Sequence, residues 1–243
     1  MTKSGKPSPL RDIRYFEGRS GMRYIEGCRE AVAFGRRISR WLGSKGYSLG
    51  SWDHLYIRVV ESDDPLESAA THEGVEWWHR FVELPVPAGF AALAEEDRDR
   101  ILIERTKWLL IKLLPGHELE VEALCHETIR VGQALQFPLT NKRTKFGSVR
   151  ASFNIPLDAR KAELLVTIAS PNGQLLAAPV VPLKFYLDAD ALVGGVSVSG
   201  DVIVISPRKS FRSEIIGKQY GPPLVFPIGI FEPRGSEAIF ADP

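Results

Sequence analysis

The sequence predicts an α+β fold, in which N-terminal helices with a small mixed sheet are followed by a β-rich C-terminal half. Before residue 136, two long segments carry apolar residues at helical spacing, and two strand-like segments lie between them. After residue 136, most apolar residues fall in short β-branched runs separated by turn residues. Because helices and strands do not alternate regularly, a doubly wound parallel sheet is the weaker prediction.

The first predicted elements are a short hairpin and an amphipathic helix. Residues 12–15 and 22–25 flank the sequence Gly-Arg-Ser-Gly, whose glycines suit a tight turn. Within residues 31–42 the apolar side chains recur at helical spacing, which predicts a helix with one buried face. Gly43 and Gly46 are then expected to end this helix.

Two strands and two further helices complete the predicted N-terminal half. Residues 53–60 and 75–84 are rich in β-branched and aromatic residues, and we expect these two strands to pair across the polar loop 61–74. Residues 90–114 predict the longest helix, whose second half is apolar on nearly every side and should therefore be buried. A third helix is expected at residues 117–135.

The C-terminal half is predicted to consist of strands joined by turns. Strands are expected at residues 148–155, 163–169, 196–199 and 202–205. The last two form a hairpin around Gly200-Asp201. Residues 174–186 are predicted as an edge strand, because prolines interrupt them. The Gly- and Pro-rich C-terminus should form an extended tail that packs on the body.

The composition is that of a globular protein. A hydrophobic fraction of 44% with a charged fraction of 25% excludes a disordered chain. We expect two regions, residues 1–135 and residues 136–243, either as separate halves or as one continuous domain. No apolar stretch is long enough to span a bilayer and no leader is recognisable, which predicts a cytoplasmic protein with no membrane partner. Cys28 and Cys125 should accordingly be reduced and buried.

The net charge of +1 hides an uneven distribution of charge along the chain. Residues 1–45 carry 11 Lys and Arg against 4 Asp and Glu, whereas residues 46–130 carry 8 against 17. Two interpretations stay open: the segments neutralise each other within the fold, or the acidic middle segment faces a basic partner.

No motif for a cofactor, a nucleophile or a bound metal is complete. His117-Glu118 lacks the second histidine of a zinc-protease helix, because position 121 is Val. A looser set of possible ligands lies on the same helix: Glu122, Cys125 and His126. Zinc would need further ligands from elsewhere. We therefore predict no cofactor, no metal and no catalytic residue.

Two other functions remain open as alternatives. His54, His79 and nearby carboxylates could form a metal-dependent or acid/base hydrolase site, because the strands that carry both histidines are expected to pair. Basic residues in segments 142–150 and 208–212 lie beside phenylalanines and could bind nucleic acid. The near-neutral charge makes a nucleic-acid partner the weaker prediction.

The run Trp-Asp-His-Leu-Tyr-Ile at residues 52–57 follows an amphipathic helix and precedes the Glu76-Trp77-Trp78 strand and a long helix. This first half of the chain resembles uncharacterised bacterial proteins, some of which are immunity proteins of polymorphic toxin systems. The segment Arg58-Val59-Val60 departs from that pattern. The resemblance carries over no catalytic residue and implies that the protein binds another protein.

The leading prediction is therefore a soluble, non-enzymatic bacterial protein that neutralises a basic toxin domain by binding it. An acidic docking surface would mainly set the rate and the specificity of association. The oligomeric state is left open. The predicted partner-binding residues are Asp63, Asp64, Glu67, Glu73, Glu76, Trp77 and Trp78.

Overall fold

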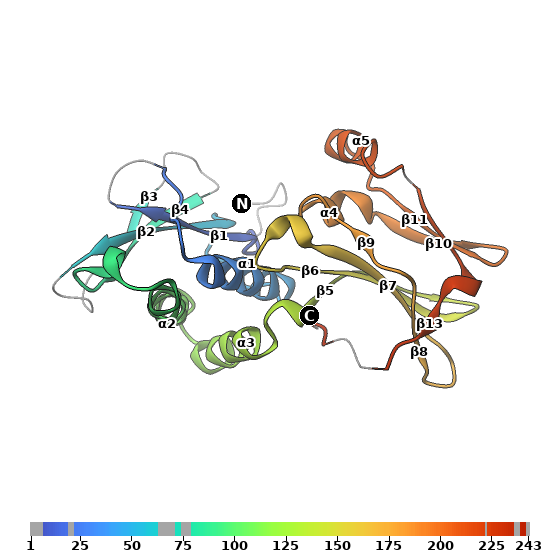
Figure 1. The fold of residues 1–243 in the computed structure, drawn as a ribbon, viewed down its shortest axis with the longest axis horizontal. Helices are drawn as coiled ribbons and strands as arrows, with labels where there is room; N and C mark the ends of the chain where they lie inside the picture. The colour runs from blue at the N-terminus through green and yellow to red at the C-terminus, as the bar shows by residue number, and fades with distance from the viewer. Residues whose placement is uncertain are drawn as a thin grey trace. The chain divides into compact units, whose positions relative to one another are not determined.

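The computed structural model (Figure 1) contains both helices and sheets, which confirms the α+β class, although the first element is a strand. The structure describes residues 7–18, 22–62, 71–73, 79–221, 223–235 and 239–241. Side chains of residues 71–73 and 79–80 fall outside this description. The chain divides into two compact units, with the boundary between Gly132 and Gln133. We call them the N-terminal unit and the C-terminal unit.

The N-terminal unit is built from a mixed sheet and three helices. Its strands are β1 (Asp12–Glu17), β2 (His54–Glu61), β3 (Thr71–Glu73) and β4 (His79–Val86). Its helices are α1 (Arg29–Ser44), α2 (Glu95–Leu113) and α3 (Glu118–Val131), with a short 3₁₀ turn η1 (Phe90–Ala92). A second turn, η2 (Gly132–Ala134), falls at the boundary of the two units.

The strand order is β1-β2-β4-β3, in which β1, β2 and β4 run parallel and β3 is antiparallel to β4. The predicted pairing of the strands that carry His54 and His79 is confirmed, because these two residues lie in register on β2 and β4. The predicted hairpin after β1 is confirmed in part. Among the described residues, its arms are joined by an antiparallel bridge between Phe16 and Tyr24, with backbone hydrogen bonds from Glu17 to Arg23 at 2.9 Å and from Ile25 to Tyr15 at 3.1 Å. What the sequence did not predict is that β1 also pairs along its whole length with β2. Helix α1 supplies the crossover that a parallel pair requires.

Helices α1, α2 and α3 lie on the same side of this sheet (Figure 1). The predicted apolar face of α1 is buried, with Phe34 and Ile38 no more than 2% exposed. Across the sheet surface the Tyr15 hydroxyl forms a hydrogen bond of 3.0 Å with the Thr106 hydroxyl of α2, and both side chains are buried. The opposite face of the sheet carries an aromatic cluster of buried residues: Phe16, Tyr56 and Phe81.

Helix α2 is shorter and less buried than the sequence predicts. The segment begins with the 3₁₀ turn, and the α-helix starts only at Glu95. Its buried residues form one stripe, which consists of Asp99, Leu102, Thr106, Leu109 and Leu110. The other apolar side chains of its second half are half-buried, so the expectation of burial on every side is wrong. One stripe suffices because a sheet and two helices cover α2 from one direction.

The C-terminal unit holds two antiparallel sheets. The larger has the order β13-β8-β7-β6-β5, with β9 paired to β7, and the smaller has the order β10-β11-β12. The strands are β5 (Gln136–Thr144), β6 (Gly147–Asn154), β7 (Glu163–Ala169), β8 (Leu175–Ala177), β9 (Val181–Pro182), β10 (Gly195–Ser199), β11 (Val202–Ser206), β12 (Leu224–Pro227) and β13 (Glu232–Pro233). The remaining elements are α4 (Asp188–Leu192), α5 (Phe211–Gly217), η3 (Ala159–Lys161) and η4 (Ile228–Ile230).

Three features of the C-terminal unit differ from the sequence prediction. Residues 174–186 form only the short strands β8 and β9, because Pro179 and Pro182 cannot donate to a continuous ladder. Helices α4 and α5 are not predicted at all. The predicted strand 163–169 and the hairpin of β10 and β11 are confirmed. Among the described residues, no helix combines the length and the apolar character needed to cross a bilayer.

Candidate functional site: a pocket at the carboxyl ends of the parallel strands

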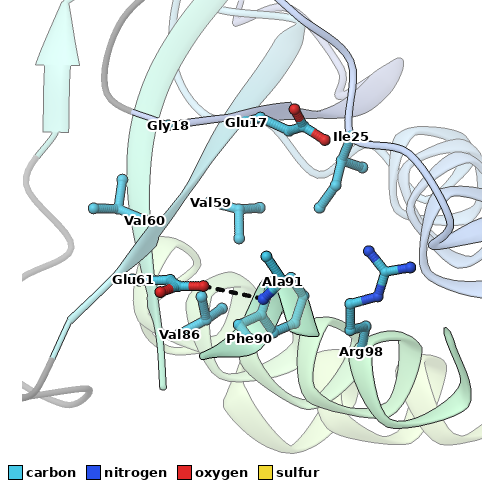
Figure 2. A pocket seen from close by; sticks show the side chains of 10 residues that line it. All are labelled: Glu17, Gly18, Ile25, Val59, Val60, Glu61, Val86, Phe90, Ala91 and Arg98. Atoms are coloured by element: carbon cyan, nitrogen blue, oxygen red, sulfur yellow. Dashed lines mark hydrogen bonds between the residues drawn. The ribbon is translucent and has the colours of Figure 1, made fainter. Parts of the chain in front are cut away.

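A pocket of about 300 Å³ lies where strands β1, β2 and β4 end (Figure 2). Its lining comes from the last residues of these three strands, from η1, from the first turn of α2 and from Ile25. In open α/β sheets, ligands typically bind outside the carboxyl ends of parallel strands. The volume is at the lower end of the range of roughly 300–1,000 Å³ that is usual for ligand pockets.

Strand register brings the lining side chains of the sheet together. Glu17 of β1 lies opposite Val59 of β2, and Glu61 of β2 lies opposite Val86 of β4. Successive side chains of a strand alternate between its two faces, so these four residues share the face to which Tyr15 also belongs. This is the face covered by the helices. The floor of the pocket is therefore apolar, and a carboxylate stands at each of two strand ends.

The carboxylate of Glu61 is held by the turn that follows β4. Its Oε2 accepts a hydrogen bond of 3.1 Å from the backbone N–H of Gly89, and its Oε1 accepts one of 3.0 Å from that of Ala91 (Figure 2). These two backbone donors lower the pKa of Glu61. Glu61 therefore stays ionised at neutral pH and places a negative charge at the pocket.

The carboxylate of Glu17 is oriented by the segment that returns beside β1. Its Oε2 lies 3.2 Å from Nε of Arg23, and its Oε1 accepts a hydrogen bond of 3.4 Å from the backbone N–H of Glu26. The arginine side chain is 69% exposed, so this ion pair is screened by solvent. Glu17 thus contributes a second acidic group, weakly paired, on the opposite side of the pocket from η1 (Figure 2).

Arg98 is the cationic residue of the lining and is incompletely paired. Its Nη1 donates a hydrogen bond of 3.2 Å to the backbone carbonyl of Glu26, but its buried Nε has no hydrogen-bond partner. A Cβ added at Gly27, where φ is +63°, would lie 2.3 Å from Nη2, so only glycine lets the guanidinium pack there. A buried polar group without a partner is rare in folded proteins. Figure 2 shows Arg98 extending from α2 toward the side of the pocket that Ile25 and Glu17 line.

The first turn of α1 is not available to bind an anion, because Asp99 of α2 occupies it. The Asp99 carboxylate accepts hydrogen bonds from the backbone N–H groups of Ala31, at 2.8 Å, and Glu30, at 3.3 Å. Burial, the largest effect, raises the pKa of Asp99, while these two hydrogen bonds oppose the shift. Free helix N–H groups are what makes a helix start attractive to phosphate. The start of α1 therefore offers no phosphate site, and the charged groups that the structure describes at the pocket are side chains.

The histidine candidates lie at the other end of the same strands. His54 begins β2 in register with His79 on β4, and Nδ1 of His54 lies 2.6 Å from Oδ1 of Asp53. Val59, the first residue of β2 in the pocket lining, comes five residues after His54, which places this end about 17 Å from the pocket at roughly 3.3 Å per residue. Within the described ranges, no group of three or more His, Cys, Asp or Glu residues could hold a metal ion.

The residues predicted to bind a partner lie mostly outside the described residues. This applies to Asp63, Asp64, Glu67, Glu76, Trp77 and Trp78. Glu73 ends β3, where its backbone pairs with that of Arg80, and its side chain is not described. The acidic docking surface therefore stays a prediction.

The other candidates from the sequence are dispersed or already paired. On α3, Oε1 of Glu122 lies 3.7 Å from Nε2 of His126, and both side chains reach solvent. Cys125 is fully buried, so these three residues do not form one ligand set. In the basic hairpin of β5 and β6, Nζ of Lys142 donates to the carbonyl of Val196 at 2.8 Å. Lys145 pairs with Asp201 at 3.5 Å.

Sequence reasoning missed all three charged residues of the pocket, Glu17, Glu61 and Arg98. A usable signal existed, because the predicted hairpin, helix and strand between residues 12 and 60 contain the order strand, helix, strand of a parallel pair with a crossover helix. Recognising it would have directed attention to the residues directly after each strand.

The comparisons with known proteins leave the site to be judged on its geometry. No protein-family model matches the chain, and neither a curated protein nor a solved structure matches it.

Proposed function

We propose that this protein binds a small molecule in the pocket at the carboxyl ends of β1, β2 and β4. The observation that carries the proposal is the convergence of Glu17, Glu61 and Arg98 from three different elements on one apolar hollow. Pockets with an apolar lining and a few oriented polar groups are the usual form of ligand sites. Binding requires no reaction, so this function agrees with the predicted non-enzymatic role.

The lining indicates the chemistry of the ligand. Val59, Val86 and Phe90 offer an apolar surface for a hydrocarbon or aromatic body. The carboxylates of Glu17 and Glu61 favour a positively charged group, and the guanidinium of Arg98, which lines the pocket, favours a hydrogen-bond acceptor. The best-fitting class is therefore a small amine or guanidine with an apolar body and one acceptor, such as an aromatic amino acid derivative.

Ligand-detected NMR with a set of small cationic, neutral and anionic aromatic compounds tests this function. Ala91 is exposed and lines the pocket, so Ala91→Trp should fill the pocket without disturbing the core and weaken binding at least about tenfold. Ala92→Trp is the matched control, because Ala92 is equally exposed and outside the lining.

A second pair of variants addresses the charge. Arg98→Gln should weaken the binding of compounds that carry an acceptor, whereas Arg100→Gln, which removes an exposed guanidinium paired with Asp97, should not. The proposal fails if no cationic compound binds the wild type, or if Ala91→Trp and Ala92→Trp bind the same compounds equally well.

Neutralisation of a basic toxin domain stays a second proposal. It is supported by the excess of 17 acidic over 8 basic residues in residues 46–130. Pull-down with the wild type, compared with a variant in which Asp63 and Asp64 are changed to Lys, tests it. Loss of a basic partner on charge reversal supports the idea, and equal capture by both proteins contradicts it. The small-molecule proposal is independent of this outcome.

A further inference from the structure

Helix α5 of the C-terminal unit is oriented with its apolar side chains outward. Phe211 is 77% exposed and Ile215, one turn later, is 48% exposed. The residues that face the body are instead small, because Ser213 and Gly217 are both buried. A helix on the surface of a globular protein normally turns its large apolar side chains toward the body and its polar ones toward solvent. Two large apolar groups on one outward face therefore need an explanation beyond folding.

The orientation of α5 is fixed at both ends. Just before its start, the backbone N–H of Arg208 donates a hydrogen bond of 2.9 Å to the carbonyl of Ala191 on α4. After its end, the Tyr220 hydroxyl donates to Oδ2 of Asp188 on α4 and accepts from the backbone N–H of Lys184, each at 2.6 Å. These contacts tie both ends of α5 to the segment around α4, with the small residues inward and Phe211 and Ile215 outward.

Four cations lie within three residues of the outward apolar pair in the sequence. Arg208 and Lys209 precede the helix, Arg212 lies within it and Lys218 follows it, and all four are exposed. None of their side chains forms an ion pair with another described residue. At 100° per residue, Arg212 and Lys218 flank Phe211 and Ile215 on the outward side of the helix. We call these six residues the α5 surface; the only acidic residue of the helix is Glu214.

We propose that the α5 surface docks the protein on an anionic lipid bilayer. Apolar side chains that enter the interface, ringed by lysines and arginines that meet anionic headgroups, are the combination by which surface helices bind membranes. The cations match such a surface in sign, and Phe211 with Ile215 would leave water in the apolar interior of the bilayer. A single-stranded nucleic acid fits less well, because stacking uses aromatic rings and Ile215 offers none.

The expectation of no membrane partner rested on the lack of a spanning segment. That lack has no bearing on a short helix that lies in the headgroup region, since such a helix needs neither the length nor the hydropathy of a spanning one. The α5 surface also belongs entirely to the C-terminal unit, so this inference does not depend on the pocket of the N-terminal unit.

Sedimentation of the full chain with vesicles tests the proposal. Vesicles of phosphatidylcholine containing phosphatidylserine should retain the protein, and vesicles of phosphatidylcholine alone should retain much less. Changing Phe211 and Ile215 to Ser should lower the partition coefficient at least about tenfold. Arg212→Gln and Lys218→Gln should each lower it about fivefold.

Matched controls separate the α5 surface from general effects. Leu119→Ser removes an apolar side chain of similar exposure, 85%, from helix α3, and Lys161→Gln removes an exposed cation elsewhere in the C-terminal unit; neither should change retention. Glu214→Lys should strengthen retention about fivefold, a gain that a misfolded variant would not produce on these vesicles alone.

Three results would overturn the proposal. The first is no retention by the vesicles that contain phosphatidylserine, and the second is retention that the changes at Phe211 and Ile215 leave intact. The third is binding of single-stranded RNA, measured by filter retention, without any binding to vesicles, which would assign the α5 surface to nucleic acid.

Discussion

The two ends of the parallel strands β1, β2 and β4 differ in how their polar groups are paired. At the amino ends, Asp53 pairs with His54 at 2.6 Å and with Arg11 at 3.6 Å, and Asp12 pairs with Arg14 at 2.5 Å. At the carboxyl ends, the Nε of Arg98 has no partner, and the carboxylates border a hollow of about 300 Å³.

The difference has a physical origin in the crossover connection. A helix that joins two parallel strands begins beside the carboxyl end of one and returns the chain to the amino end of the next. The loops at the carboxyl ends must therefore turn away from the sheet to enter α1 and α2, and the space between them is the pocket. His54, which the sequence offered only for the alternative hydrolase site, lies at the amino ends, where Asp53 is within reach of both His54 and Arg11.

The largest expected effect is on the reaction rate of the two buried thiols, Cys28 and Cys125. Burial raises the pKa of Cys28, which precedes α1, to about 11 and that of Cys125 in α3 to about 12. At neutral pH both thiols should react with a disulfide reagent at least about 100-fold more slowly than an unburied cysteine does, since only the thiolate reacts. The rate is measured by absorbance in native buffer and in guanidinium chloride.

Cys125→Ala isolates the reaction of Cys28 in this experiment. If Cys28 then reacts in native buffer nearly as fast as in denaturant, the pocket extends to the start of α1 and the carboxyl end is more open than the structure has it.

The next effect concerns the carboxylate that closes the first turn of α1. Asp99→Ala leaves the N–H groups of Glu30 and Ala31 without their acceptor, and we expect a loss of about 2 kcal/mol in the free energy of unfolding. Asp99→Asn keeps an acceptor oxygen and should cost less than half of that. Urea unfolding followed by circular dichroism measures both, and equal losses for both variants would contradict the capping role.

Asp99 also has a defined effect on the pH dependence of stability. Because its pKa in the folded protein is raised above the ordinary value of 3.8, the folded state keeps this proton to higher pH than the unfolded state does. Its ionisation therefore lowers the free energy of unfolding as the pH rises from below 3.8 through the folded pKa. Asp99→Asn should lack this decrease. An unchanged pH profile in that variant would show that the ionisation of Asp99 does not cause the decrease.

A smaller effect is expected between the two ends, where β1 meets α2. Tyr15→Phe removes the buried hydrogen bond to Thr106 and should cost about 1 kcal/mol of the free energy of unfolding. The double variant Tyr15→Phe with Thr106→Val should cost less than the sum of the single changes, because the second change removes the polar group left unpaired. Additive losses would show that the two hydroxyls do not interact.

The smallest effect is expected at the amino ends. Asp53→Asn keeps an acceptor oxygen for the part-buried hydrogen bond with His54 and should change the free energy of unfolding by no more than about 0.5 kcal/mol. It should also leave the affinity of the pocket for cationic compounds unchanged, as measured by NMR titration. A marked loss of affinity would mean that the two ends of the parallel strands are coupled, which would contradict their separate roles.

Sequence reasoning succeeded where local periodicity decides the structure. The buried face of α1 is confirmed through Phe34 and Ile38, and β7 has the predicted bounds of residues 163–169. It failed where partners lie far apart in the chain, because the parallel pairing of β1 with β2 was not predicted. The three charged residues of the pocket were missed for the same reason, since each belongs to a different element.

By itself the sequence determined the α+β class, the position of α1 and the turn between β10 and β11. These features depend on which neighbouring side chains can leave water together, and spacing along the chain records that directly. Only the tertiary structure decided that Glu17, Glu61 and Arg98 meet at one end of a parallel sheet, and that α5 turns Phe211 outward. Both depend on which distant element covers a given face, and periodicity carries no information about the partner.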